Sequence, residues 1–539
     1  MKEVRRDRSG GENLIDRAIA FFSPSTGVKR RFARHILAKT GGYTSGDRSR
    51  RANRSWELSS GSADAEILAD LVALRSDSRD LMRKAPLARG AINTNVTNVV
   101  GTGLLPQAMP DVRTLMKDGN LSQDQIDDFI FGAERVFETW SGSTECDASR
   151  RLNFKSMQSL LLRSTLESGD IFVTRRMVEN QKSGIKLALQ LIEADRVDNP
   201  NREKDTASRA GGVERNSLGA PTGYHILQAH PGNSWVAADK FKTVLFPATL
   251  KSGEWNVLHM MFMERPEQTR GVPYLAPVME PLKQLVRYTE AELAAAVLSA
   301  MFTVFVKTES GDSGLPASID GSHADDDEVK MGNGAIVDLA PGEEVQFADP
   351  NRPNISFDPF VQAILRQIGV GLEIPFEILI SHFTASYSAA QAALLQAWKF
   401  FRARRQWLSD YFCTPVYEAV ISEAVGRGII KAPGFFTSPM LRAAYLKVIW
   451  NGPPRGSIDP VKEVTAAEVM EDRGWKTAQE ITAELTGGDF DSKHARRVRE
   501  AQMRLELPQP PAIPAKVVPV SAVQETDPEI DAEDEEDTE

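Results

Sequence analysis

The sequence predicts an α+β protein that is mainly helical. Long segments carry apolar residues at helical spacing, and a central stretch carries strand-like segments between turns rich in Asn, Gly and Pro. The composition, 41% hydrophobic and 26% charged over 539 residues, is that of an ordinary globular protein. Two cysteines, Cys146 and Cys413, are too few for a disulfide framework, so a reducing compartment is expected.

The first half is expected to begin with an arm and three helices. Residues 1–60, rich in Arg, Ser and Gly, resemble a partly mobile basic arm. Helical spacing follows from residue 64 and again over 86–100, where Gly101-Thr-Gly103 ends the pattern. Residues 122–140 form the third helix, with Ser122 and Gln125 as a capping box.

The middle of the chain predicts an α+β unit. A helix is expected over 154–168, and strands are expected over 170–178, 185–192, 224–228 and 255–262. Residues 199–222 contain several Gly, Pro and Asn residues and are expected to form a long exposed loop or hairpin.

The second half is dominated by long helices. One is expected over 274–306, with its last turns giving way to a strand, and a shorter one over 357–372. A polar gap, 381–388, precedes the longest helical pattern, 389–425, which Pro415 should kink. Three further helices fit 460–473, 477–485 and 492–505, and the remainder is too polar to fold alone.

Charge is segregated along the chain. The formal net charge of −10 equals the charge of the last fifteen residues, which hold ten acids and no base. Residues 1–60 carry fourteen bases and six acids, whereas residues 307–358 carry three bases and twelve acids. Such segregation predicts surfaces with different partners.

Several function classes lack their motifs. No P-loop and no His-Glu-x-x-His occurs. The closest histidine pair, His225 and His230, lies five residues apart next to a Pro-Gly turn and suits no helical ligand pair, so no metal site and no cofactor are expected. Gly101-Thr-Gly103 precedes no helix and is a helix stop. No segment is apolar for long enough to span a membrane, and the short apolar stretch 18–22 is not a secretory core.

Two charged clusters have alternative interpretations. The acidic group Asp325, Asp326, Asp327 and Glu328 is a solvated loop or, less simply, a cation site without the spacing of a calcium loop. The bases Lys399, Arg402, Arg404 and Arg405 have a density suited to phosphate contacts, but an ordinary exposed helix face would look the same.

Several sequence words, in this order, resemble the lambda-type branch of the portal proteins of tailed bacteriophages. They are Leu81-Met-Arg-Lys-Ala-Pro-Leu-Ala-Arg-Gly-Ala-Ile92, Asn98-Val-Val-Gly-Thr-Gly-Leu104, Ile192-Glu-Ala-Asp-Arg-Val197, Glu267-Gln-Thr-Arg-Gly-Val-Pro-Tyr274, Gly369-Val-Gly-Leu-Glu-Ile-Pro375, Ser386-Tyr-Ser-Ala-Ala-Gln391, Trp398-Lys-Phe-Phe-Arg-Ala-Arg-Arg405 and Ile458-Asp-Pro-Val-Lys-Glu463. They cover most of residues 60–505.

The resemblance implies a portal-type protomer in a cyclic ring, typically of twelve subunits. Its parts would be a basic arm (1–60), an α+β wing (61–272), a stem helix (273–306), an acidic clip (307–356), a second stem helix (357–377), a tunnel loop (378–388), a long kinked helix with the wing return (389–454), a crown (455–507) and a disordered acidic tail (508–539).

The implied function is a non-enzymatic channel at one capsid vertex for genome packaging and ejection, assembled in the host cytoplasm and retained in the virion. The implied partners are further copies of the chain, double-stranded DNA bound non-specifically, the terminase large subunit, a head–tail connector or adaptor, and the major capsid and scaffold proteins. No membrane is involved.

The implied site residues fall into three groups. Tunnel-loop candidates are Ser381, His382, Thr384, Ser386, Tyr387 and Ser388; phosphate-contact candidates are Lys399, Arg402, Arg404 and Arg405; clip-lining candidates are Asp325, Asp326, Asp327, Glu328, Glu343 and Glu344. An acidic lining would let DNA slide without sticking. The alternative is a metal-dependent nucleic-acid-processing enzyme that uses carboxylates of residues 307–358.

Overall fold

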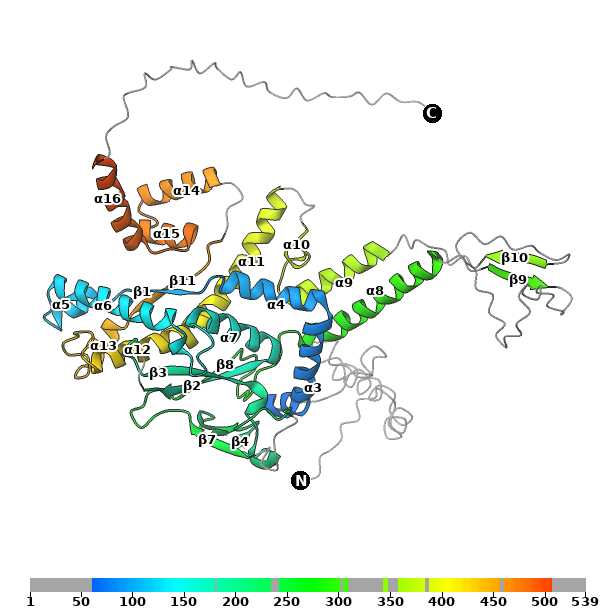
Figure 1. Cartoon of the computed structure of the whole chain (residues 1–539), viewed down its shortest axis with the longest axis horizontal. Coiled ribbons are helices and arrows are strands. Elements are labelled where there is room, and N and C mark those ends of the chain that lie inside the picture. Colours follow the sequence, from blue (N-terminus) through cyan, green and yellow to red (C-terminus); the bar gives the residue numbers. More distant parts are fainter. Residues whose placement is uncertain are drawn as a thin grey trace, which may run out of the picture. The chain divides into compact units, whose positions relative to one another are not determined.

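The computed structural model describes residues 61–179, 182–233, 242–300, 304–308, 343–347, 357–382, 387–455 and 460–506 (Figure 1). Within these ranges the protein is α+β and mainly helical, as the sequence predicts. The predicted arm, most of the predicted clip and the acidic tail lie outside the described residues.

The chain divides into two compact units. Of the described residues, the smaller unit contains 61–70 and 264–269, where Asp64 accepts hydrogen bonds from the backbone N–H and the hydroxyl of Thr269, at 2.8 and 2.6 Å. Glu66 pairs with Arg265 in the same unit. All the elements that follow belong to the larger unit, apart from the first turns of α3.

Four of the five N-terminal helices in the described residues match the predicted periodicity, and the short α5 (Val112–Lys117) was not predicted. The other four are α3 (Ala63–Lys84), α4 (Pro86–Val99), α6 (Gln123–Gly142) and α7 (Phe154–Ser168). The predicted capping box opens α6: the Ser122 hydroxyl accepts from the backbone N–H of Gln125, and the Gln125 side chain accepts from that of Ser122. The face of α6 that ends in Trp140 is buried, because its apolar residues recur every three or four positions.

The described residues also form four antiparallel sheets. A three-stranded sheet has the order β3–β2–β8, and a four-stranded sheet the order β4–β5–β6–β7. The strands are β1 (Leu105–Ala108), β2 (Asp170–Met177), β3 (Leu187–Glu193), β4 (Arg209–Ala210), β5 (Val213–Arg215), β6 (Pro221–Leu227), β7 (Thr243–Pro247), β8 (Val257–Met261), β9 (Val304–Thr308), β10 (Glu343–Phe347) and β11 (Val448–Asn451). β1 pairs with β11, and β9 with β10.

In the described residues, the helices and sheets pack around two apolar cores. The larger one includes an aromatic cluster in which Phe137 lies within 6 Å of the rings of Trp140, Phe154, Tyr417 and Trp450. A smaller core, with Phe172 and Tyr224 in edge contact at 5.4 Å, contains residues of both larger sheets. Burial of these large aromatic side chains contributes favourably to folding.

The C-terminal half contains α8 (Met279–Ala300), α9 (Phe357–Gly371), α10 (Phe376–Leu379), α11 (Tyr387–Leu408), α12 (Thr414–Gly426), α13 (Pro439–Tyr445), α14 (Pro460–Asp472), α15 (Ala478–Thr486) and α16 (Phe490–Glu506). The predicted helix over 274–306 is shorter than expected. A 3-10 turn, Ala276–Val278, precedes α8, because Pro277 and Pro281 cannot donate the hydrogen bonds of a helix interior. The predicted strand after this helix is confirmed as β9.

The longest predicted helix is interrupted at Pro415. A π-helical turn, Ser409–Cys413, joins α11 to α12, and Pro415 lies in the first turn of α12. Proline has no N–H, and its ring collides with the carbonyl four residues earlier; the wider π turn relieves that collision. The expected kink is therefore a change of helix type directly before the proline.

Candidate functional site

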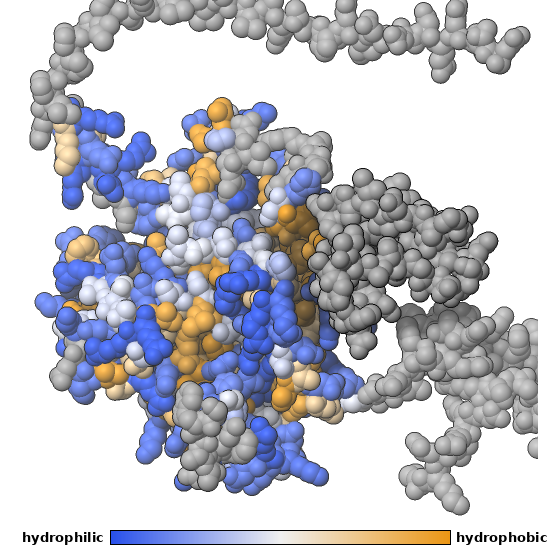
Figure 2. All heavy atoms as spheres, turned by 45° about the vertical axis from the view of Figure 1, so that its right-hand side comes forward, coloured by the Kyte–Doolittle hydropathy of each residue, from blue (hydrophilic) through white to orange (hydrophobic). Residues whose placement is uncertain are grey.

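The first candidate region is the helix pair α8 and α9. Tyr288 of α8 stacks on Phe357 at 5.5 Å and meets Phe360 edge-on at 5.3 Å, so the two helices pack side by side (Figure 1). Leu293 and Val297 of α8 and Phe360 of α9 remain 67%, 50% and 51% exposed. Figure 2 shows that such apolar patches interrupt an otherwise largely hydrophilic surface. These three residues are candidates for a contact with another molecule.

Of the six acidic residues predicted to line the clip, the structure describes two. Glu343 and Glu344 begin β10, and the antiparallel register places them opposite Thr308 and Lys307 of β9. Asp325, Asp326, Asp327 and Glu328 lie outside the described residues. The structure therefore does not test whether these six acidic residues line one surface.

The predicted loop 378–388 is shorter than expected at both ends. Pro375, whose fixed φ suits a helix start, directly precedes α10, which ends at Leu379. Helix α11 begins at Tyr387. Ser381 and His382 are exposed, and the backbone N–H of His382 donates to the carbonyl of Glu377 at 3.0 Å. Thr384 and Ser386 lie outside the described residues, and Tyr387 and Ser388 form the first turn of α11.

The four predicted phosphate-binding bases of α11 divide into two pairs. Lys399 and Arg402, three residues apart on one face, are exposed. Arg405 instead donates hydrogen bonds to the carbonyl oxygens of Asn98, Val99 and Pro453 at 2.9, 3.2 and 2.9 Å. Burial, with a smaller contribution from the nearby Arg402, lowers the pKa of Arg405 to about 10. Arg405 thus caps the C-terminal end of α4.

Arg404 lies in an aromatic cage. Its guanidinium carbon is 4.4 Å from the ring centroid of Phe400, 4.5 Å from that of Tyr274 and 4.7 Å from that of Phe262. Burial lowers its pKa, and its Nε and Nη1 have no hydrogen-bond acceptor among the described residues. Cation–π contacts on this scale hold the side chain inside the protomer. Only Lys399 and Arg402 are left with the exposure that a phosphate contact needs.

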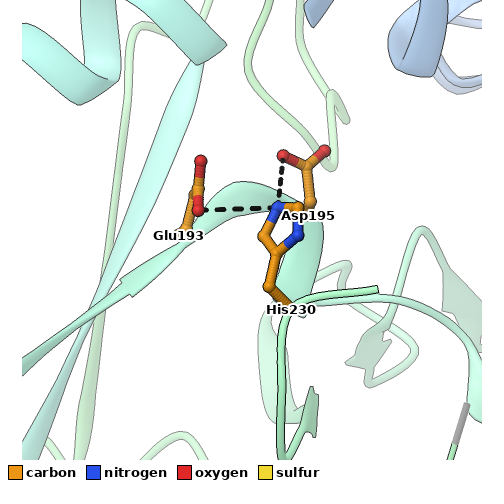
Figure 3. A group of neighbouring side chains, drawn as sticks. All are labelled: Glu193, Asp195 and His230. Atoms are coloured by element: carbon orange, nitrogen blue, oxygen red, sulfur yellow. Dashed lines mark ion pairs between the residues drawn. The ribbon is translucent and has the colours of Figure 1, made fainter. Parts of the chain in front are cut away.

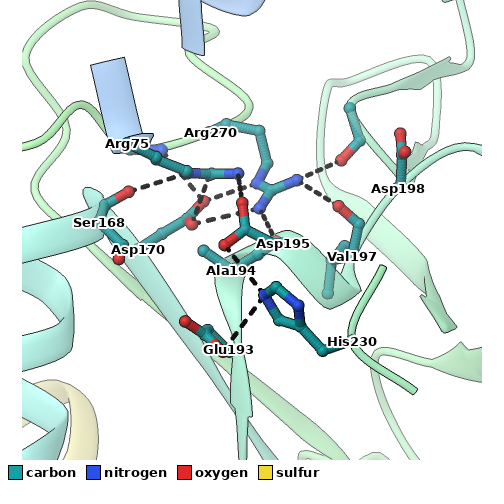
Figure 4. A network of polar contacts seen from close by, with 12 residues as sticks. Arg75, Ser168, Asp170, Glu193, Ala194, Asp195, Val197, Asp198, His230 and Arg270 are labelled. Atoms are coloured by element: carbon teal, nitrogen blue, oxygen red, sulfur yellow. Dashed lines mark hydrogen bonds and ion pairs between the residues drawn. The ribbon is translucent and has the colours of Figure 1, made fainter. Parts of the chain in front are cut away.

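A buried carboxylate, Asp170, forms the centre of a network that the sequence analysis missed (Figure 4). Its Oδ1 accepts from Nη2 of Arg75 at 2.8 Å, and its Oδ2 accepts from Nε of Arg270 at 2.6 Å. Nε2 of His259 donates to Oδ2 at 3.1 Å, and the backbone N–H of Gly271 does so at 3.2 Å. Two cations and two further donors thus compensate one fully buried negative charge.

Arg270 is the main organiser of this network. It is 2% exposed and also donates to the carbonyl oxygens of Ala194, Val197 and Gly211 at 2.8, 2.8 and 2.6 Å. Its guanidinium carbon lies 5.1 Å from the Phe172 ring centroid. One side chain therefore joins β2, the turn that follows β3, and the loop between β4 and β5.

The approach of Arg270 to Asp170 requires glycine on both sides. Gly169 has φ +89°, and a Cβ on it would collide with the backbone of Gly271. A Cβ on Gly271 would collide in turn with the carbonyl of Gly169. Only glycine allows this close approach of two backbones.

Interactions within the network determine the protonation states of Asp170 and His259. Burial favours protonation of Asp170, but the charges of Arg270 and Arg75 outweigh it and hold the pKa of this carboxyl well below its usual range. Burial lowers the pKa of His259, against the opposing effect of Asp170, so the imidazole is neutral near pH 7. Its Nε2 then carries the proton that it donates to Asp170.

A second cluster, Glu193, Asp195 and His230, adjoins this network (Figure 3). His230 Nε2 lies 3.5 Å from Glu193 and 3.6 Å from Asp195, at a cavity of 390 Å³. Ligand atoms this close could hold a metal ion. However, Arg79 pairs with both carboxylates, at 2.9 Å to Glu193, and Arg75 lies 3.8 Å from Asp195, so two cations already oppose the two negative charges. The arrangement shown by these contacts is an ion-pair cluster.

The missed residues had a signal in the sequence. Arg270 and Gly271 lie within the word 267–274, and Glu193, Ala194, Asp195 and Val197 lie within the word 192–197, both of which carried the family resemblance. These two words meet in space through Arg270 and the backbone of the second word. Periodicity could not have predicted a contact between residues so far apart in the chain.

Comparisons with known proteins identify the family. Residues 49–405 match the family described as phage portal protein, lambda family. The chain is 24% identical over 475 residues to portal protein B of Escherichia phage lambda, covering 84% of this chain and 87% of that protein. The portal protein of Escherichia phage N15 is also 24% identical over 475 residues, covering 84% of this chain and 88% of that protein.

Among solved structures, a chain from the neck of an empty gene transfer agent particle matches with a TM-score of 0.39 and 13% identity, over 75% of this chain and 92% of that one. A chain from the neck of the native particle matches with a TM-score of 0.38 and 12% identity, over 76% and 93%. In the described part of this protein no helix has the length and apolar character needed to cross a bilayer. The chain belongs to the lambda family of phage portal proteins, a structural component of the virion with a portal role at the capsid vertex.

Proposed function

We propose that copies of this chain close into a ring, with the twelve subunits that the resemblance implies, and that double-stranded DNA passes through its centre during packaging and ejection. The family match over residues 49–405 is the observation that carries the proposal. It includes the helix pair α8 and α9, with β9 and β10 between them in the sequence.

Exposed apolar side chains of this helix pair support assembly. Leu293, Val297 and Phe360 are each at least half exposed and lie on helices that already pack against one another. Leaving such side chains in water forfeits about 1.5–3 kcal/mol each, which burial against the next copy would recover. The proposed subunit contact is heterologous, and contacts of that kind close into rings when the rotation permits.

The proposed contact with DNA is weak and non-specific. Lys399 and Arg402 provide two exposed positive charges on α11, and the loop before this helix presents Ser381 and His382. A sliding channel needs contacts of this strength, because strong pairing with phosphates would hold the DNA in place. The acidic residues of the clip, including Glu343 and Glu344, would repel the phosphate backbone.

The remaining partners follow from the same proposal. A terminase large subunit would dock on the ring during packaging, because this chain has no nucleotide-binding P-loop of its own. A head–tail connector would replace the terminase afterwards, and the major capsid and scaffold proteins would surround the ring. Assembly would take place in the host cytoplasm.

Electron microscopy and native mass spectrometry of the purified protein test the ring. We expect particles with a central hole and a mass that is a multiple of the 59.4 kDa protomer. Leu293→Asp with Val297→Asp should abolish the ring, whereas Leu218→Asp, a change at a leucine that is 91% exposed, should not. A strict monomer at high protein concentration would overturn the proposal.

A nuclease assay addresses the alternative function. The ring proposal predicts that the protein leaves linear double-stranded DNA intact in the presence of magnesium. Cleavage that disappears in the double variant Asp326→Ala, Asp327→Ala would instead favour a metal-dependent enzyme.

A further inference from the structure

The helices α14, α15 and α16 form a segment without a core of its own. α14 has thirteen residues and α15 nine, and neither contains a buried residue in the described structure. Trp475, between them, is 75% exposed. Helices of fewer than about 12–15 residues are marginal in water unless a face is packed. This segment therefore lacks a packing partner that its stability requires.

One face of α14 is partly buried, and an adjacent face is exposed. Glu463, Ala467 and Met470 are partly buried and line a small cavity together with residues of α15. Beside them, Val461, Val464, Glu468 and Glu471 are exposed and recur at a spacing of three or four residues. We call these four residues the acidic stripe of α14.

α16 presents the complementary chemistry. Every described side chain from Asp491 to Arg504 is exposed. The helix carries five bases and three acids, whereas α14 carries one base and four acids. Arg497 and Arg504 lie two turns apart on one side, and Val498 lies about 100° further round the helix than Arg497. We call these three residues the basic stripe of α16.

We propose that the acidic stripe of α14 binds the basic stripe of α16 in the neighbouring copy of the chain. The two stripes are different surfaces with opposite charge and with valines to bury, which is what a heterologous ring contact requires. This inference rests on the proposed ring. It adds a second subunit interface, in which α14–α16 gain their missing packing only on assembly.

A second copy of the chain fits these surfaces better than DNA does. Phosphates would match Arg497 and Arg504, but DNA would leave Val461 and Val464 exposed and would be repelled by Glu468 and Glu471. Binding of the acidic tail, residues 525–539, to α16 would likewise leave the valines of α14 in water.

Charge reversal in three variants tests the interface. Glu468→Arg with Glu471→Arg, and separately Arg497→Glu with Arg504→Glu, should each weaken the contact through like-charge repulsion. All four changes in one chain should restore it, because each interface joins one α14 to one α16. Asp128→Arg with Glu138→Arg, at two exposed acids of α6, is the matched control.

The readout is a cross-link placed at the contact. Val464→Cys with Val498→Cys should give a ladder of covalent oligomers with a short bismaleimide. Cys146 and Cys413 contribute little background, because both are buried and burial raises the pKa of each thiol, that of Cys146 to about 12. We expect each charge-reversed pair to reduce the ladder at least tenfold, the fourfold variant to restore it, and the control to leave it unchanged.

The outcomes separate this inference from the ring itself. Rings without a ladder, or a ladder insensitive to all the reversals, would overturn the α14–α16 contact and leave the proposed function standing. A cross-link confined to single chains would also overturn it, as would a ladder that forms only when DNA is added or when residues 525–539 are deleted. Absence of rings in the unmodified protein would instead overturn the proposed function.

Discussion

At the scale of a residue, Asp170 shows how a portal subunit stabilises a buried charge. Its carboxylate is fully enclosed, yet every neighbouring polar group is a donor: Arg75, Arg270, His259 and the backbone N–H of Gly271. The arginines are themselves nearly inaccessible, so the pairs are not screened by water as surface pairs are. Removal of one partner would leave an uncompensated charge in the core.

Arg270→Met should therefore destabilise the protein strongly. The variant deletes two hydrogen bonds to Asp170 and strands the carbonyl oxygens of Ala194, Val197 and Gly211, so we expect a loss of about 3–5 kcal/mol in the free energy of unfolding. Arg89→Met, at an exposed helical arginine, should change it by less than about 0.5 kcal/mol. Urea unfolding followed by circular dichroism measures both; equal midpoints would show that the network carries no stability.

The same network predicts a dependence of stability on pH. The pKa of His259 is lowered in the folded state, so the unfolded chain, with a histidine pKa of about 6.5, binds the proton first, and stability falls as the pH drops through that value. The pKa of Asp170 is also lowered, so its contribution is present above about pH 4 and lost below it.

Thermal melting between pH 7.5 and 5 should therefore show a steeper decline for the unmodified protein than for His259→Gln. His382→Gln, at an exposed histidine, should leave the slope unchanged. Parallel curves for all three proteins would contradict the assigned neutral state of His259.

At the scale of an element, α11 combines an outward and an inward set of arginines. Arg402 is exposed, whereas Arg404 is enclosed by aromatic rings and Arg405 caps α4. The spacing of the four bases revealed a charged helix but not which charges face inward, because partners such as Asn98 and Pro453 are remote in the chain. Sequence reasoning therefore predicted the helix but not which of its bases are buried; the phosphate contact of Lys399 and Arg402 stays a prediction.

Arg402→Met should change DNA binding, whereas Arg405→Met should change stability. The first should leave stability unchanged, lower the affinity of assembled rings for double-stranded DNA, and reduce the slope of log affinity against log salt concentration by about one for each phosphate that the side chain no longer neutralises. The second should cost about 2–4 kcal/mol of stability, because three carbonyl groups lose a charged donor.

Unfolding midpoints and fluorescence anisotropy at several salt concentrations measure the two effects. Arg215→Met, at a partly exposed arginine of β5, is the control for DNA affinity. A reduced salt slope in Arg405→Met without loss of stability would show that Arg405 contacts DNA instead of stabilising the end of α4.

At the scale of the whole molecule, the sequence predicted elements better than it predicted their connections. Helical periodicity found α6, α7 and α9 nearly to the residue, because each has one continuous buried face. It overextended the helix over 274–306, where prolines impose a 3-10 turn, and it missed the Asp170 network, which joins α3, β2, β8 and residue 270. Contacts between remote segments leave no periodic signal.

The loop before α11 provides the last prediction. Because α10 ends at Leu379 and α11 begins at Tyr387, residues 383–386 can be replaced by Gly-Ser-Gly-Ser without shortening either helix. The replaced segment contains no Lys, Arg, Asp or Glu, so its contact with DNA would be steric or through hydroxyl groups. We expect rings to assemble normally while retention of packaged DNA in filled capsids falls several-fold, measured as nuclease-protected genome length.

Ser252→Gly with Ser217→Gly, in surface turns far along the chain, is the control. Failure of the loop variant to form rings would show that the loop is a structural part of the subunit interface, and normal retention would remove it from the proposed DNA contacts.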